Sequence, residues 1–226
     1  MSEKHQTAPV PTLPTYTEVE QLRIAVENRQ SLEARRSLRD FSDRPVSLDA
    51  IKECLRAAGL APSGANFQPW HFVVVTQPDM KHKIRVAAEA EESAFYNGLA
   101  PDEWLEALTP LGTDSQKPFL ETAPCLIAIF RKPYDVIEQT TQDEKRKNYY
   151  SMESVGIATG FLIRALHEIG LSTLTHTPSP MQFLNRILGR PSHERPFLLL
   201  VVGYPGADAT VPVITKKKLD EFVTVF

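Results

Sequence analysis

The segment CLIAIFR, residues 125–131, constrains the fold of this chain more than any other stretch of its sequence. It is apolar at every position before its final arginine. Side chains of a strand alternate between the two faces of a sheet, so a strand of this kind is buried on both faces. We therefore expect residues 125–131 to form a central strand of a sheet that is covered on both sides.

Two further segments, WHFVVVT at 70–76 and PFLLLVVGYP at 196–205, have the aliphatic and aromatic composition of strands, and LSTLTHT at 171–177 predicts a short strand or a loop. Apolar spacing and capping residues predict helices between them, at about residues 17–36, 48–61, 78–97, 101–122, 149–169 and 179–188. The charged residues 132–146 are typical of a loop. Strands separated by helices predict an α+β fold with three layers, α/β/α.

Composition indicates one soluble cytoplasmic domain. The 226 residues carry a formal net charge of −3, which favours neither nucleic acid nor an anionic membrane as a partner. Residues 1–16 are polar and rich in proline, so we expect a disordered or extended arm, followed by a single domain over 17–226. No stretch is apolar enough for a signal peptide or a membrane span. Cys54 and Cys125 lie in apolar segments, which favours buried free thiols over a disulfide.

Several common catalytic motifs are absent from the sequence. It contains no G-x-G-x-x-G, no G-x-x-x-x-G-K and no G-x-S-x-G. It also lacks C-x-x-C and H-E-x-x-H, so we expect no metal site. A dinucleotide-binding Rossmann unit, a zinc hydrolase and a serine hydrolase are therefore disfavoured.

Two polar clusters could bind an anion and a planar ligand. RRSLR places Arg35, Arg36, Ser37 and Arg39 within five residues, and arginine forks match phosphate oxygens. Taken alone, the same cluster could be the solvated basic end of a helix. The stretch APSGANFQPW, residues 61–70, has small residues that would let backbone amides approach a planar ligand, or it could be an elaborate turn.

Two further patterns carry polar groups at regular spacing. Glu92 and Tyr96 lie four residues apart and share one face of a predicted helix. With Lys117 they could hold a zwitterion, although a solvated acidic face is the plainer interpretation. In TLTHTP, residues 173–178, alternating threonines would present hydroxyls on one face of an extended segment, or they could simply reflect the β-propensity of threonine.

In this order along the chain, these segments resemble the flavin-dependent nitroreductase superfamily, and more closely its iodotyrosine deiodinase branch. The resemblance covers roughly residues 30–222. RRSLRDFSDRPV and APSGANFQPWHFVVV match the superfamily. KHKIRVAAEAEESAFY, KPFLETAPCLIAIF, TLTHTPSPMQFLNRILGRPSHERPFLLLVVGYP and ATVP match the branch. The resemblance implies a nitroreductase-like mixed sheet flanked by helices, in a domain-swapped homodimer with FMN at the subunit interface.

The resemblance also implies a role for each matched residue. The residues implied for FMN are Arg35, Arg36, Ser37, Arg39, Ser63, Thr175, His176, Thr177 and Lys216, with the Thr177 hydroxyl as the partner of flavin N5 and thus the catalytic residue. Glu92, Tyr96 and Lys117 match the residues that hold the amino-acid end of a halotyrosine, and the backbone of Ala65 would meet its phenolate. Lys216 stands where the family usually has an arginine, and Asn66 where relatives often have a histidine.

The implied activity is FMN-dependent reductive dehalogenation of halotyrosines, such as mono- and diiodotyrosine, with electrons from NAD(P)H or a separate reductase. A general NAD(P)H-dependent nitroreductase or quinone reductase on the same fold is the alternative. A flavin-binding or storage protein is a third possibility. Only the dehalogenase needs Glu92, Tyr96 and Lys117 together, because they would clamp a zwitterion.

Overall fold

A computed structural model describes residues 7–137 and 144–226, in two compact units, residues 1–35 and 36–226. In the first unit, helix α1 (Glu18–Glu33) follows residues 7–17, which have an irregular backbone. Thr17 caps this helix: its side chain accepts the Glu20 N–H at 3.3 Å, and the Glu20 carboxylate accepts the Thr17 N–H at 2.8 Å. This reciprocal capping box fixes the start of the predicted first helix.

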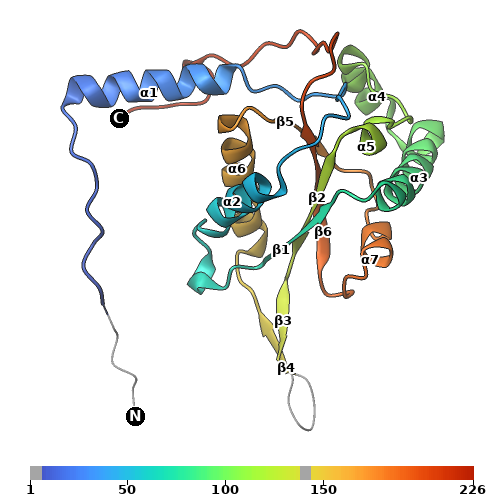
Figure 1. The fold of residues 1–226 in the computed structure, drawn as a ribbon, viewed down its shortest axis with the longest axis horizontal. Coiled ribbons are helices and arrows are strands. Elements are labelled where there is room, and N and C mark those ends of the chain that lie inside the picture. The colour runs from blue at the N-terminus through green and yellow to red at the C-terminus, as the bar shows by residue number, and fades with distance from the viewer. Residues whose placement is uncertain (1–6, 138–143) are drawn as a thin grey trace. The chain divides into compact units, whose positions relative to one another are not determined.

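The second unit is built on a sheet in the order β1-β2-β6-β5 (Figure 1). Its strands are β1 (Trp70–Val75), β2 (Cys125–Arg131), β5 (Ser172–His176) and β6 (Arg195–Gly203). Neighbouring strands pair antiparallel, and a parallel bridge between Ser37 and Thr173 adjoins β5, so the sheet is mixed. The predicted central strand 125–131 pairs on both sides, with β1 and with β6.

Helices cover both faces of this sheet (Figure 1). Helices α2 (Leu48–Gly59) and α6 (Ser151–Glu168) lie on one face, and α3 (Pro78–Ala94), α5 (Phe119–Thr122) and α7 (Phe183–Ile187) lie on the other. The shorter elements are a 3₁₀ turn at Gly64–Asn66, a π-helical turn at Phe95–Leu99, helix α4 (Asp102–Leu108) and 3₁₀ turns at Thr109–Leu111 and Leu219–Glu221. The predicted three-layer α/β/α arrangement is confirmed.

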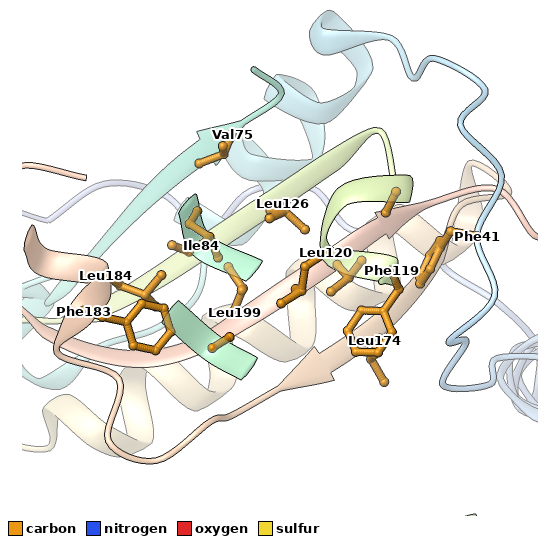
Figure 2. Close-up of a cluster of buried hydrophobic side chains, with 14 of the residues drawn as sticks. Phe41, Val75, Ile84, Phe119, Leu120, Leu126, Leu174, Phe183, Leu184 and Leu199 are labelled. Carbon is orange, nitrogen blue, oxygen red and sulfur yellow. The ribbon is translucent and has the colours of Figure 1, made fainter. Parts of the chain in front are cut away.

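The side chains of β2 alternate between two separate hydrophobic cores. Leu126, Ala128 and Phe130 pack with α3, α5 and α7, in the cluster that Figure 2 shows. Ile127 and Ile129 pack with α2 and α6 on the opposite face. All five side chains are fully buried. The uninterrupted apolar sequence of the strand follows directly from this two-sided burial.

The prediction of a loop over residues 132–146 is wrong for its described part. Strand β3 (Tyr134–Ile137) pairs antiparallel with β4 (Glu144–Lys147). The pair is held by charge rather than by apolar burial: Arg146 donates to Asp135 at 2.9 Å, and the Lys145 ammonium lies 5.2 Å from the centroid of the Tyr134 ring. A charged strand of this kind has no hydrophobic alternation, so its sequence did not indicate it.

Both cysteines are buried free thiols, as predicted. Burial raises the pKa of the Cys125 thiol to about 12, so it stays protonated at neutral pH. Within the described ranges, the structure holds no cluster of three metal-ligating side chains. Nor does any helix in the described part of the chain have the length and apolar character needed to cross a membrane.

Candidate active site

A cavity of about 310 Å³ opens beside the C-terminal end of β5, on the face of the sheet that carries α3 and α5. Its lining comes from α3, the π-helical turn, α4, α5, β5 and the loops between them: Arg39, Glu92, Phe95, Tyr96, Trp104, Leu108, Thr113, Lys117, Phe119, Leu174, Thr175, His176, Thr177 and Ser179. The structure therefore brings together residues predicted separately for substrate and for cofactor. Glu92, Tyr96 and Lys117 share this one wall with Arg39 and residues 175–177.

Glu92 and Lys117 form a buried ion pair in this wall. The Lys117 Nζ lies 3.3 Å from Glu92 Oε2, and their side chains are only 4% and 14% exposed. Lys117 Nζ also donates to Thr113 Oγ1 at 3.2 Å and to the carbonyl of Asp114. A buried charge requires such partners. An ammonium and a carboxylate held side by side can bind the carboxylate and ammonium of an amino acid by exchanging partners.

Tyr96 completes the polar wall from the π-helical turn after α3. Its hydroxyl donates to the carbonyl of Thr113 at 3.3 Å, and its ring centroid lies 5.6 Å from Lys117 Nζ. Sequence reasoning missed Thr113, although it lies four residues before Lys117. It also missed Trp104, which lines the cavity while 55% of its surface is exposed. An exposed tryptophan in a helical segment was the available signal, because aromatic rings gather at ligand sites.

The predicted alternation of exposed threonines holds only at the end of β5 and just after it, because Thr173 is buried. Thr175 and Thr177 are exposed, whereas His176 between them is buried. The His176 ring packs edge-on against Phe119, with centroids 5.7 Å apart, and its Nε2 has no hydrogen-bond partner among the described residues. Burial, with smaller effects of Lys117 and Arg39, lowers the pKa of His176 to about 3. The imidazole is therefore neutral and has one free polar atom at the cavity wall.

The low pKa of His176 predicts a pH-dependent stability. As the pH falls below about 6.5, an unfolded chain takes up this proton, whereas the folded chain resists it down to about pH 3. The unfolded state then binds more protons, so the free energy of unfolding decreases over that window. Between about pH 7 and about pH 5, we expect the free energy of unfolding of FMN-free wild type to fall by about 2 kcal/mol more than that of a His176→Leu variant. Urea unfolding measures this difference; equal losses in the two proteins would contradict it.

A second cavity, of about 400 Å³, shares Arg39 with the first. It is lined by Ser37, Arg39, Asp40, Pro110, Leu111, Gly112, Thr210, Val211 and Pro212. Arg36 donates to the carbonyl of Pro212 and so reaches the same region. Ser37 is bridged to Thr173 of β5, which fixes the arginine segment, residues 36–39, against the edge of the sheet. Cationic forks and a hydroxyl beside the end of a strand suit a phosphate group.

Six predicted residues lie outside the lining of the first cavity: Arg36 and Ser37, which belong to the region of the second cavity, and Arg35, Ser63, Ala65 and Lys216. Ser63 immediately precedes the 3₁₀ turn after α2 and Ala65 lies within it; the Gly64 N–H of this turn donates to Ser154 Oγ of α6 at 3.5 Å. Ala65 adopts a left-handed backbone, φ 48°, which is strained for a residue with a Cβ. Lys216 is exposed in the C-terminal segment. Arg35 is the last residue of the first unit, and its role stays a prediction.

The mixed sheet between two helical layers, with arginines and hydroxyls beside its β5 edge, defines a nitroreductase-like fold. The family model described as Nitroreductase family matches residues 32–204, and the chain belongs to this family, in its iodotyrosine deiodinase branch. The iodotyrosine deiodinase of Haliscomenobacter hydrossis is 54% identical over 207 residues, with 92% of each chain covered. Human iodotyrosine deiodinase 1 is 42% identical, over 92% of this chain and 71% of its own length.

Solved structures agree with this assignment. A crystal structure of oxidized iodotyrosine deiodinase bound to FMN and 3-iodo-L-tyrosine matches with a TM-score of 0.73 at 30% identity, covering 88% of this chain and all of the other. A nitroreductase with bound FMN from Bacteroides fragilis shares the fold, with a TM-score of 0.62 at 19% identity, over 88% of this chain and 98% of its own.

Proposed function

We propose that this chain is an FMN-dependent enzyme that removes halide reductively from halotyrosines such as mono- and diiodotyrosine, giving tyrosine and halide. The observation that carries the proposal is the buried Glu92–Lys117 pair in the same cavity wall as the Thr175 and Thr177 hydroxyls. A general nitroreductase or quinone reductase has no need of a zwitterion clamp. The relatives named above support the same activity, since they are iodotyrosine deiodinases.

The residues at the site fit FMN. Arg36, Ser37 and Arg39 would hold its phosphate, and the hydroxyls of Thr175 and Thr177 would lie along its ring, with Thr177 at N5. The buried, unpartnered Nε2 of His176 offers a further polar contact. Bound FMN would supply the two electrons of the reaction, in which the carbon–halogen bond breaks, a carbon–hydrogen bond forms with one proton, and halide leaves.

The chain's own residues would bind and orient the substrate. Glu92 would take its ammonium, Lys117 its carboxylate, and Tyr96 would close the aromatic side of the wall. Anchoring the amino-acid end fixes where the halogenated ring can lie. The free energy gained by binding that end therefore offsets the entropy lost when the ring is oriented for reaction. Phe95, Trp104 and Leu108 add apolar surface that would exclude water from the reacting ring.

Ser63 and Ala65 would contribute to the site from a second subunit. Their turn packs against the start of α6, away from the cavity lining of the same chain. Met152, Ile157 and Phe161 of α6 are exposed apolar side chains that a domain-swapped homodimer would cover. We also propose that residues 17–226 act as one FMN-binding domain, and that Arg35 and Lys216 assist at the phosphate. NAD(P)H or a separate reductase is the proposed electron donor, and a cytoplasmic location stays a prediction.

Arg39 is a direct test of the cofactor site, because it lines both cavities. Arg39→Ala removes a charged fork and is expected to raise the dissociation constant of FMN at least about tenfold. Arg39→Lys keeps the positive charge but not the planar guanidinium that can donate two parallel hydrogen bonds, and is expected to recover part of the lost FMN affinity. Titration of FMN into apoprotein, followed by flavin fluorescence, measures both values. Unchanged FMN affinity in Arg39→Ala would refute this assignment.

The proposed reaction predicts its products. With dithionite as the reductant under anaerobic conditions, the FMN-loaded protein should convert monoiodotyrosine into tyrosine and iodide in equal amounts. Chromatography of tyrosine and an iodide electrode measure the two products independently. Protein without FMN serves as the control and should release neither. Absence of iodide from the loaded protein would refute the dehalogenase assignment.

A further inference from the structure

Glu89 lies one helical turn before Glu92. It contacts the zwitterion clamp, which is formed by Glu92, Tyr96 and Lys117, from outside the cavity. Its Oε1 accepts the backbone N–H of Lys117 at 2.6 Å. Its side chain is 19% exposed, and it is not part of the cavity lining. Helix α3 therefore contacts Lys117 twice: Glu92 pairs with the ammonium group, and Glu89 holds the main chain.

Glu89 is itself held in place by a charged partner. Arg85, one turn earlier, donates from Nε to the same Oε1 at 2.8 Å and from Nη1 to Glu121 Oε2 at 2.9 Å. Glu121 belongs to α5, so this network ties α3 to the short helix that follows Lys117. The hydrogen bonds from Arg85 and the pairing with two carboxylates raise the pKa of its guanidinium, which stays charged.

The position of the Lys117 main chain decides where its ammonium group can lie. Residue 118 is proline, which has no N–H and restricts the backbone of Lys117, so Lys117 carries the only N–H of this residue pair. The Lys117 side chain is 4% exposed and has to meet acceptors on Thr113, Asp114 and Glu92. A shift of its backbone by a fraction of an ångström would disturb these contacts.

The charges on this face of α3 also have to be kept apart. Glu89 and Glu92 are three residues apart and so are neighbours on the helix surface. Arg85 neutralises Glu89, which leaves Glu92 as the carboxylate that pairs with Lys117 and would meet a substrate ammonium. Glu89 and Glu92 therefore have different roles because Arg85 pairs with the first carboxylate and the Lys117 ammonium with the second.

We propose that Glu89 is a positioning residue that sets the zwitterion clamp by holding the main chain of Lys117. This inference rests on the proposed function and deepens it. Glu89 makes the affinity for the amino-acid end of the substrate depend on its hydrogen bond with the Lys117 main chain, and it leaves the halogenated ring and FMN unaffected. Its signature is a loss of discrimination between a halotyrosine and a halophenol that lacks the amino-acid end.

The experiment measures two dissociation constants on FMN-loaded protein, for diiodotyrosine and for 2-iodophenol, by quenching of flavin fluorescence. Glu89→Ala is expected to raise the constant for diiodotyrosine about tenfold, with a change of less than about twofold for 2-iodophenol. Glu89→Gln keeps an acceptor without the charge and is expected to show a smaller loss. Glu121→Gln is the matched control: it loosens Arg85 without touching Lys117, and its ratio of the two constants should equal that of wild type.

Each alternative outcome has a definite meaning. An unchanged ratio in Glu89→Ala, or in Glu89→Gln if the alanine variant does not hold FMN, overturns the positioning role. A change in Glu121→Gln as large as that in Glu89→Ala also overturns it, because general loosening of α3 would then suffice. Wild type that binds 2-iodophenol but not diiodotyrosine overturns the proposed function itself, and the positioning role with it.

Discussion

Glu92→Gln is expected to raise the dissociation constant for diiodotyrosine about a hundredfold or more. The substitution keeps the size of the side chain but removes the charge that pairs with Lys117 Nζ at 3.3 Å in a nearly buried wall. Losing one member of such a pair leaves the other charge without compensation, which costs several kcal/mol. The substrate ammonium loses its counter-charge at the same time. Quenching of flavin fluorescence by diiodotyrosine measures the loss.

Two controls separate this effect from general damage. The affinity for FMN should stay at the wild-type value in Glu92→Gln, because the residues proposed to contact FMN come from β5 and from the arginine segment. Glu91→Gln changes a neighbouring carboxylate outside the cavity lining and should leave diiodotyrosine binding unchanged. Equal losses of FMN and diiodotyrosine affinity in Glu92→Gln would count against the clamp.

Phe130→Ala is expected to lower the free energy of unfolding by about 4 kcal/mol. Phe130 is fully buried in the central strand β2, within the core that packs against α3, α5 and α7. Truncation removes a large apolar surface and leaves a cavity. The surrounding side chains of α3, α5, α7 and the sheet are closely packed and cannot easily move to fill it. Urea unfolding at a fixed FMN concentration measures the change, since bound FMN stabilises the folded state by mass action.

The matched control is an exposed apolar residue on α3, one of the helices that pack against the core containing Phe130. Val86 of α3 is 54% exposed, so Val86→Ala should change the free energy of unfolding by less than about 0.5 kcal/mol. A loss of under about 1 kcal/mol in Phe130→Ala would mean that β2 is not the buried centre of the domain.

Local sequence patterns were sufficient to predict the layers of the fold. The apolar run at residues 125–131 predicted the two-sided burial of β2, and the helix predicted from residue 48 begins there, with the Ser47 side chain accepting the Ala50 N–H at 3.2 Å. The charged hairpin of β3 and β4 was missed because its stability comes from cross-strand charge pairs. Such pairs depend on register, and register is not visible before the strands are placed.

The site was only partly predictable for a similar reason. Glu92 and Tyr96 could be matched by helical spacing, but their contact with Lys117 is a tertiary contact that spacing alone does not fix. Residue patterns also could not separate Glu89 from Glu92, since both lie on one acidic helix face. Their roles differ because one meets the ammonium of Lys117 and the other its backbone N–H.

The most direct test of the proposed function is an anaerobic reoxidation experiment. The FMN-loaded protein is reduced with one equivalent of dithionite and divided between two cells, one receiving diiodotyrosine and the other a nitroaromatic compound. Flavin absorbance then reports the transfer of electrons to each compound. We expect diiodotyrosine to reoxidise the flavin, with release of iodide. Reoxidation by the nitroaromatic compound alone would contradict the account and would indicate a general nitroreductase.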